Sequence, residues 1–203
     1  MNAAKTPRPA ASASPRKPRA DAQRNRDRLL ETAKAAFTEL GAEASLEEIA
    51  RRAGVGIGTL YRHFPTRDAI VAAVYRHEGE QLAEAAQRLL ASMPPGEALH
   101  QWMRLAIDYI ATKKLMVSAL SAMADSSTLA AASGPRIVDA INLLVDRAKA
   151  AGDIRADVDA NDMMRALVGF TYANITPNSA DPNWQKSALR LMDVLMAGLK
   201  PGA

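Results

Sequence analysis

Residues 54–64, Gly-Val-Gly-Ile-Gly-Thr-Leu-Tyr-Arg-His-Phe, combine alternating glycines with hydroxyl, guanidinium and imidazole groups, which could form a phosphate-binding loop. The spacing of these residues does not match the phosphate-binding loops of known enzyme classes. A dinucleotide-binding loop that starts at Gly54 needs a glycine where Thr59 stands, and it follows a strand. A Walker loop needs Gly-Lys followed by Ser or Thr, which this stretch lacks. Because residues 45–53 have a helical pattern, the glycines are predicted to form a turn between two helices.

Two other stretches begin like metal sites and do not complete them. His77-Glu78 opens a zincin-like pattern, but Gln81 stands where the second histidine is required. Residues 157–162 begin like a calcium loop, but Asp162 replaces the necessary glycine and Val168 replaces the bidentate glutamate. Asp159 and Asp162 are instead predicted to cap the helix that follows. Since the chain also has no cysteine and no nucleophile elbow, the sequence predicts no enzyme activity, no metal and no cofactor.

The elements that must position residues 54–64 are helices. Residues 21–40 repeat apolar side chains at helical spacing, and Ser45 with Glu48 marks the start of a second helix. A third helix over about 56–63 must end near Pro65, because the residue before a proline avoids helical geometry. Two short helices joined by a glycine-containing turn form a helix-turn-helix. Its predicted core comprises Phe37, Ile49, Leu60 and Phe64.

The rest of the chain also has helical patterns and no convincing strand. Helices are expected over 67–91, 97–114, 115–125, 135–151, 160–175 and 183–199, with a Ser/Ala/Gly-rich break at 126–134. The fold class is therefore all-α, about nine helices. A helix-turn-helix domain is expected at 21–66, followed by a second helical domain at 67–203. The helix at 67–91 is expected to be the only element that contacts both parts.

Charge is distributed unevenly along the 203 residues. Residues 1–67 contain 13 Lys/Arg and 7 Asp/Glu, whereas the remaining residues contain 13 and 15. A basic amino-terminal third predicts a polyanionic partner, although a basic solubilising tail explains the charge equally well. Residues 1–20 hold five basic side chains and no acid among Pro, Ala and Ser, and are expected to be a disordered arm. The lack of cysteine and of long apolar runs predicts a cytoplasmic protein without a membrane partner.

Residues 45–75, SLEEIARRAGVGIGTLYRHFPTRDAIVAAVY, strongly resemble the DNA-binding region of TetR-family transcriptional regulators. The matching features are the Ala-Gly-Val turn, the Gly-Thr-Leu-Tyr-x-His-Phe helix and the basic-acidic pair that opens the next helix. The resemblance extends over residues 24–75. It implies a homodimer that binds double-stranded operator DNA, most often as a repressor, with a small effector bound in the C-terminal domain.

The resemblance also implies roles for individual residues. Thr59 would lie near base edges, Tyr61 and His63 would contact phosphates, and Arg67 would make a further phosphate contact. Ile57 departs from the more usual polar residue, and two interpretations stay open: contact with a thymine methyl group, or packing back onto the core. The complete set of predicted DNA-binding residues is Ser45, Ile57, Gly58, Thr59, Tyr61, Arg62, His63 and Arg67.

The C-terminal two-thirds yields weaker predictions. A ligand pocket could be lined by Trp102, Met103, Ile110, Met116, Met123 and Phe170, although an ordinary bundle core explains these residues as well. The last two expected helices are apolar on more than one face, which predicts a homodimer interface. The candidate interface residues are Met163, Leu167, Trp184, Ala188, Leu191, Leu195 and Leu199. Parts of this region weakly resemble SbtR-like C-terminal domains.

The predicted function is sequence-specific, DNA-binding transcriptional regulation by a repressor that a small apolar effector releases from its operator. Two alternatives remain open from sequence. One is an activator or architectural DNA binder with the same DNA contacts. The other is a helical enzyme or partner-binding bundle whose helix-turn-helix is vestigial.

Overall fold

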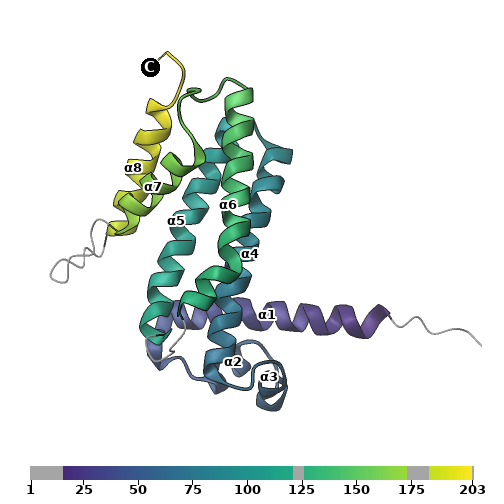
Figure 1. Cartoon of the computed structure of the whole chain (residues 1–203). Coiled ribbons are helices and arrows are strands. Elements are labelled where there is room, and N and C mark those ends of the chain that lie inside the picture. Colours follow the sequence, from purple (N-terminus) through teal and green to yellow (C-terminus); the bar gives the residue numbers. More distant parts are fainter. Residues whose placement is uncertain (1–15, 121–125, 173–182, 203) are drawn as a thin grey trace, which may run out of the picture.

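The computed structural model describes residues 16–120, 126–172 and 183–202, and all regular structure in these ranges is helical (Figure 1). The all-α prediction is confirmed, and the eight α-helices of these ranges are close to the nine expected. No helix in the described ranges is long and apolar enough to cross a membrane. The elements are α1 (Arg16–Leu40), the 3-10 turn η1 (Gly41–Glu43), α2 (Leu46–Arg52), α3 (Ile57–His63), α4 (Arg67–Ser92), α5 (Pro95–Leu120), α6 (Ser126–Ala150), α7 (Ala160–Tyr172) and α8 (Trp184–Gly198).

Three helix boundaries differ from the sequence prediction. The segments expected at 97–114 and 115–125 join into one helix that continues to Leu120, because the Lys-Leu-Met-Val-Ser sequence after residue 113 contains no helix breaker. The break expected at 126–134 is wrong, because α6 covers that segment and has Pro135 inside it. α1 begins at Arg16, within the expected arm, and residues 1–15 lie outside the described residues.

The first four helices enclose one apolar core. α1 lies across the lower end of the α4–α5–α6 bundle, and α2 and α3 lie at that same end (Figure 1). All four residues of the predicted core are at most 2% exposed, which confirms that prediction: Phe37, Ile49, Leu60 and Phe64. Burial of these large side chains holds the short helices α2 and α3 in a fixed arrangement against α1 and α4.

A second apolar core lies between α4, α5, α6, α7 and α8. Its largest side chain, Trp102 of α5, is fully buried, and its indole N–H donates a 2.8 Å hydrogen bond to the carbonyl of Leu82 in α4. Asp159 and Asp162 open α7 as a reciprocal cap, each carboxylate accepting the other residue's backbone N–H at 2.8 and 3.1 Å. This confirms the cap predicted from their spacing.

α4 takes part in both cores. Ile70 and Val74 pack in the first, whereas Leu82 and Ala86 pack in the second. Between them Glu78 is buried and forms an ion pair with Lys34 of α1. The expectation that only this helix contacts both parts is wrong, because α5 also packs against α1 and η1.

At the end of the bundle far from α1, hydrogen bonds join the α6–α7 connection to the start of α5 and to the end of α8. Gly152 ends α6 with a φ of 74°, a left-handed conformation that favours glycine. The next residue, Asp153, accepts a hydrogen bond from the backbone N–H of Gly96 at the start of α5. Arg155 then donates its N–H to the carbonyl of Leu199 after α8, at 2.9 Å. The α6–α7 connection therefore fixes the ends of two other helices.

Candidate nucleic-acid interface

The turn between α2 and α3 is set by backbone hydrogen bonds. The Ser45 hydroxyl caps α2 by accepting the N–H of Glu48 at 3.1 Å. At the other end Gly54 has a φ of 65°, its N–H donates to Arg51, and the Val55 N–H donates to Ala50 at 3.0 Å. This is the pattern of a Schellman turn, in which glycine tolerates the left-handed position. The predicted cap and turn are confirmed.

α3 is a short helix with one buried side and one open side. Leu60 is fully buried in the first core, whereas Ile57 and Tyr61 are 39% and 43% exposed. Arg62 is also exposed, and its Nε donates a 3.1 Å hydrogen bond to the carbonyl of Gly58 in the same helix. The buried leucine thus fixes the helix while the opposite side remains accessible to a partner.

The other predicted DNA contacts on α3 are less accessible. Thr59 and His63 are half-buried, and the imidazole ring of His63 lies 6.1 Å from the ring of Phe64. Gly56 accepts the N–H groups of Thr59 and Leu60 and thereby starts the helix. The structure therefore brings Ile57, Gly58, Tyr61 and Arg62 onto one open surface, which we call the α3 face, with Thr59 and His63 at its edges.

Arg67 has contacts inside the protein that the sequence did not predict. Its guanidinium lies 5.1 Å from the centre of the Phe37 ring and donates a hydrogen bond to the carbonyl of Ala44. Thr66 caps α4 just before it by accepting the N–H of Ala69 at 3.1 Å. Arg67 thus attaches the start of α4 to α1 and to the residue before the α2 cap.

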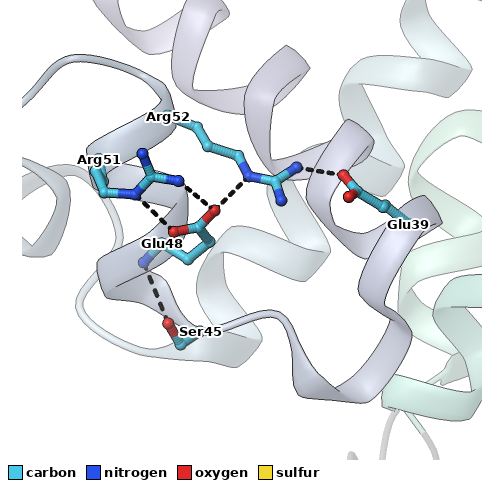
Figure 2. Close-up of polar contacts among 5 residues, drawn as sticks. All are labelled: Glu39, Ser45, Glu48, Arg51 and Arg52. Carbon is cyan, nitrogen blue, oxygen red and sulfur yellow. Dashed lines mark hydrogen bonds and ion pairs between the residues drawn. The ribbon is translucent and has the colours of Figure 1, made fainter.

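A chain of ion pairs connects α1 to α2 (Figure 2). The Glu48 carboxylate accepts hydrogen bonds from Arg51 at 2.7 and 2.8 Å and from Arg52 at 2.6 Å, and Arg52 also binds Glu39 of α1. The hydrogen bonds from Arg51 and Arg52 lower the pKa of Glu48 to about 2. Glu48 is therefore an anion at neutral pH, and Ser45 supplies the cap that the Ser-Glu spacing predicted.

Sequence reasoning missed these arginines. The Glu48–Arg51 and Glu48–Arg52 spacings of three and four residues were a readable signal, because such residues are neighbours on a helix. The contact between Glu39 and Arg52 joins two helices, and no local spacing in the sequence indicates it because the residues are 13 positions apart. The same holds for Arg26, whose guanidinium lies 5.6 Å from the centre of the Phe64 ring.

The candidate pocket residues do not form an open cavity as a group. Trp102 and Met103 are fully buried, Ile110 is 8% exposed, and Phe170 is half-buried against the same core. Met116 lies in α5, and Met123 lies outside the described residues. A cavity of about 550 Å³ instead lies at the far end of the bundle, lined by His100, Met196 and Lys200 among others.

The candidate dimer residues divide into three groups by exposure. Four are buried within the protomer, namely Met163, Leu167, Ala188 and Leu199, and two are half-buried, namely Trp184 and Leu195. The Lys114 ammonium lies 3.6 Å from the centre of the Trp184 ring, and burial lowers the pKa of this lysine. Only Leu191 is well exposed, at 42%. The large apolar side chains of α7 and α8 that are exposed are Val168, Tyr172, Leu191 and Val194, which we call the outer α7–α8 face.

The chemistry available at the α3 face is that of contact rather than catalysis. It presents a phenol, a guanidinium and an isoleucine side chain on a rigid support, which suits phosphate and base-edge contacts. Across the described ranges, no group of three or more His, Cys, Asp or Glu side chains is arranged to hold a metal ion.

Comparison with known proteins decides the family. Residues 29–74 match the family described as bacterial regulatory proteins, tetR family. Residues 94–201 match the SbtR-like C-terminal domain of transcriptional regulators. The chain belongs to the TetR family. The resemblance noted in both parts of the sequence is thereby confirmed, and TetR-family proteins are helix-turn-helix transcriptional regulators rather than enzymes.

Solved structures of TetR-family proteins resemble the whole fold. A TetR transcriptional regulator from Streptomyces coelicolor is 43% identical, with a TM-score of 0.77 over 88% of this chain and 99% of that one. A TetR regulatory protein from Mycobacterium vanbaalenii is 36% identical, with a TM-score of 0.73 over 90% and 98%. An HTH-type transcriptional regulator from Staphylococcus aureus is 51% identical over 47 residues, which are 23% of this chain and 25% of that protein. That match therefore spans about a quarter of the relative's length.

Proposed function

We propose that this TetR-family regulator is a repressor that binds a roughly palindromic operator with the α3 face of each of two protomers. The observation that carries the proposal is the two-sided character of α3. Leu60 is fully buried, whereas Ile57 and Tyr61 on the other side are exposed. A helix held in this way can enter the major groove without changing the core behind it. Since DNA is its ligand, we propose that it acts in the cytoplasm.

Within this proposal the DNA contacts have separate roles. Tyr61 and Ser45 would bind phosphates and set the position of the head on the duplex, whereas Ile57 and Thr59 would contact base edges. His63 would also contact a phosphate, and Arg62 and Arg67 would add positive charge near the backbone. The bare backbone at Gly58 would allow close approach of the helix.

Footprinting on the chromosomal region upstream of the gene tests operator binding. A protected, roughly palindromic site supports the proposal, whereas salt-sensitive coating without a preferred site supports an architectural DNA binder. In vitro transcription from the same fragment then separates the remaining alternatives. A repressor lowers the transcript yield as it fills the site, and an activator raises it.

We further propose that two protomers pair through the outer α7–α8 face. Val168 is 50%, Leu191 42% and Val194 64% exposed, and these apolar side chains lie on two neighbouring helices. Covering such a surface is favourable, and a two-fold pair would present two α3 faces to half-sites about one helical turn apart. In place of the four buried members of the predicted set, this proposal uses exposed neighbours on or beside the same two helices; the buried members are Met163, Leu167, Ala188 and Leu199.

We further propose that a small apolar effector bound in the second core releases the protein from its operator. The candidate residues Trp102, Met103, Ile110 and Phe170 line one region of the second core, which α4 connects to the first. A ligand that enters there has to displace packed side chains, and it would release DNA only by favouring the conformation with poor operator affinity.

A compound screen that follows both thermal stability and operator release tests for the effector. Phe170→Ala is the variant of choice, because Phe170 is half-buried and Trp102→Ala would remove the centre of the core. We expect the variant to bind operator normally and to lose the response to a hit. An unchanged response places the effector elsewhere, and a screen without hits removes this part of the proposal.

A further inference from the structure

Ile57 is an apolar side chain that the fold leaves uncovered. It is the first residue of α3, it is 39% exposed, and it lies outside the core that contains Leu60 and Phe64. Single exposed apolar residues are common on protein surfaces. The neighbours of Ile57 make this one informative.

The two flanking glycines have no role inside the protein that requires glycine. Gly54 needs a positive φ, but Gly56 has an ordinary φ of −67° and Gly58 also lacks a positive φ. Among the described residues, a Cβ atom built at Gly56 or Gly58 would meet no heavy atom within 4 Å beyond its chain neighbours and the backbone of its own helix. Alanine would stabilise a helix more than glycine does at position 58. The bare backbone on both sides instead leaves Ile57 projecting and lets an external surface come close to it.

The residues on either side of Ile57 in the sequence carry no polar side chain. Gly56 and Gly58 offer no side-chain donor, and the Nε–H of Arg62 is directed at the Gly58 carbonyl. In the major groove, the apolar group that a base pair presents is the C5 methyl group of thymine. We infer that Ile57 contacts a thymine methyl group in each operator half-site, so that part of the sequence preference rests on an apolar contact.

This inference rests on the proposed operator binding, and the test separates the two. The probe is the footprinted operator duplex, in which each thymine is replaced in turn by deoxyuridine, which removes only the methyl group. For the wild-type protein we expect one thymine per half-site at which the replacement weakens binding about fourfold, the value of one buried methyl group. For Ile57→Ala we expect weaker binding to the unmodified operator and no further loss with deoxyuridine at that position.

Two control variants sharpen the result. Tyr61→Phe removes a hydroxyl group one turn away and should still discriminate thymine from deoxyuridine as the wild type does. Gly58→Ala should keep or raise the melting temperature and yet weaken operator binding, because its new methyl group would obstruct close approach. If Ile57→Ala still discriminates the methyl group, or if no thymine shows an effect while wild-type protein binds the operator specifically, the inference is wrong and the proposed function stands. If the wild-type protein prefers no site, both fail.

Discussion

The Oδ2 atom of Asp153 accepts a 2.7 Å hydrogen bond from the backbone N–H of Gly96, and the two residues touch so closely that alanine does not fit at position 96. A Cβ atom added to Gly96 would lie 2.7 Å from the Cβ atom of Asp153. The Asp153 carboxylate caps the first turn of α5. It belongs to the α6–α7 connection, whereas a helix cap usually comes from a residue next to the helix in sequence. One contact thus determines both the residue type at position 96 and the position of the connection.

Substitutions at this contact should destabilise the protein. We expect Gly96→Ala to lower the free energy of unfolding by about 1–3 kcal/mol through overpacking. Asp153→Ala should lower it by about 1 kcal/mol through loss of the cap. Urea unfolding at fixed protein concentration measures both. Gly58→Ala is the matched control, because its added methyl group meets open space and should leave stability unchanged or higher. Equal effects at positions 58 and 96 would disprove the steric explanation.

Tyr61→Phe tests the phosphate contact on α3. The variant should bind operator and unrelated duplexes more weakly by the same amount, about 1 kcal/mol for one hydrogen bond, because a phosphate carries no sequence information. Fluorescence anisotropy with both duplexes at one salt concentration provides the comparison. The melting temperature should not change, since the side chain is 43% exposed. A loss confined to the operator would instead assign Tyr61 to base recognition.

Leu191→Glu tests the outer α7–α8 face. We expect monomers in sedimentation velocity, with an unchanged helical content and poor operator affinity, because a charge would have to be buried in the interface. Leu195→Glu is less informative, since Leu195 is half-buried against its own core. Val138→Glu on α6 is the control, because Val138 is 46% exposed and lies on another helix. A dimer that survives Leu191→Glu would exclude this surface.

The Glu48 ion pairs predict a dependence of stability on pH. Hydrogen bonds from Arg51 and Arg52 lower the pKa of Glu48 from 4.5 to about 2 in the folded protein. A lowered pKa in the folded state stabilises the protein above pH 4.5, and this contribution is lost as the pH falls through 2. Wild type should therefore be more stable than Glu48→Gln at pH 6, and the difference should shrink below pH 4.5. Urea midpoints at pH 6, 4 and 3 measure the trend, and a difference that is constant over this range would contradict it.

Local signals in the sequence predicted local structure well. Ser45, Gly54 and the Asp159–Asp162 pair have their predicted roles, because a cap or a turn depends on residues only three or four positions away. Apolar spacing likewise identified Leu60 as the buried side of α3. The predicted break at 126–134 failed because Ser and Ala are compatible with a helix, and burial of Ile137, Ile141 and Leu144 further along α6 stabilises that helix.

Contacts between distant segments could not be predicted from one sequence. Gly96 and Asp153 are 57 residues apart, and Arg67 binds the carbonyl of Ala44 from 23 positions away. For the same reason the sequence identified α7 and α8 as apolar on two sides but did not distinguish the side that faces the protomer core. Ala188 and Leu191 both belong to the apolar repeat of α8, but Ala188 is fully buried whereas Leu191 is 42% exposed.

The position of α4 in both cores has a geometric consequence for the spacing of two DNA-binding heads. Its 26 residues extend over about 39 Å at 1.5 Å per residue. A tilt of about 5° around the end packed in the second core would move the end that begins at Arg67 by about 3 Å, close to the rise of one base pair. In a two-fold dimer the opposite head would move by the same distance. Such a tilt along the duplex would therefore move each head by about one base-pair step and, because the two-fold axis reverses the direction, change the spacing of the two heads by about two steps.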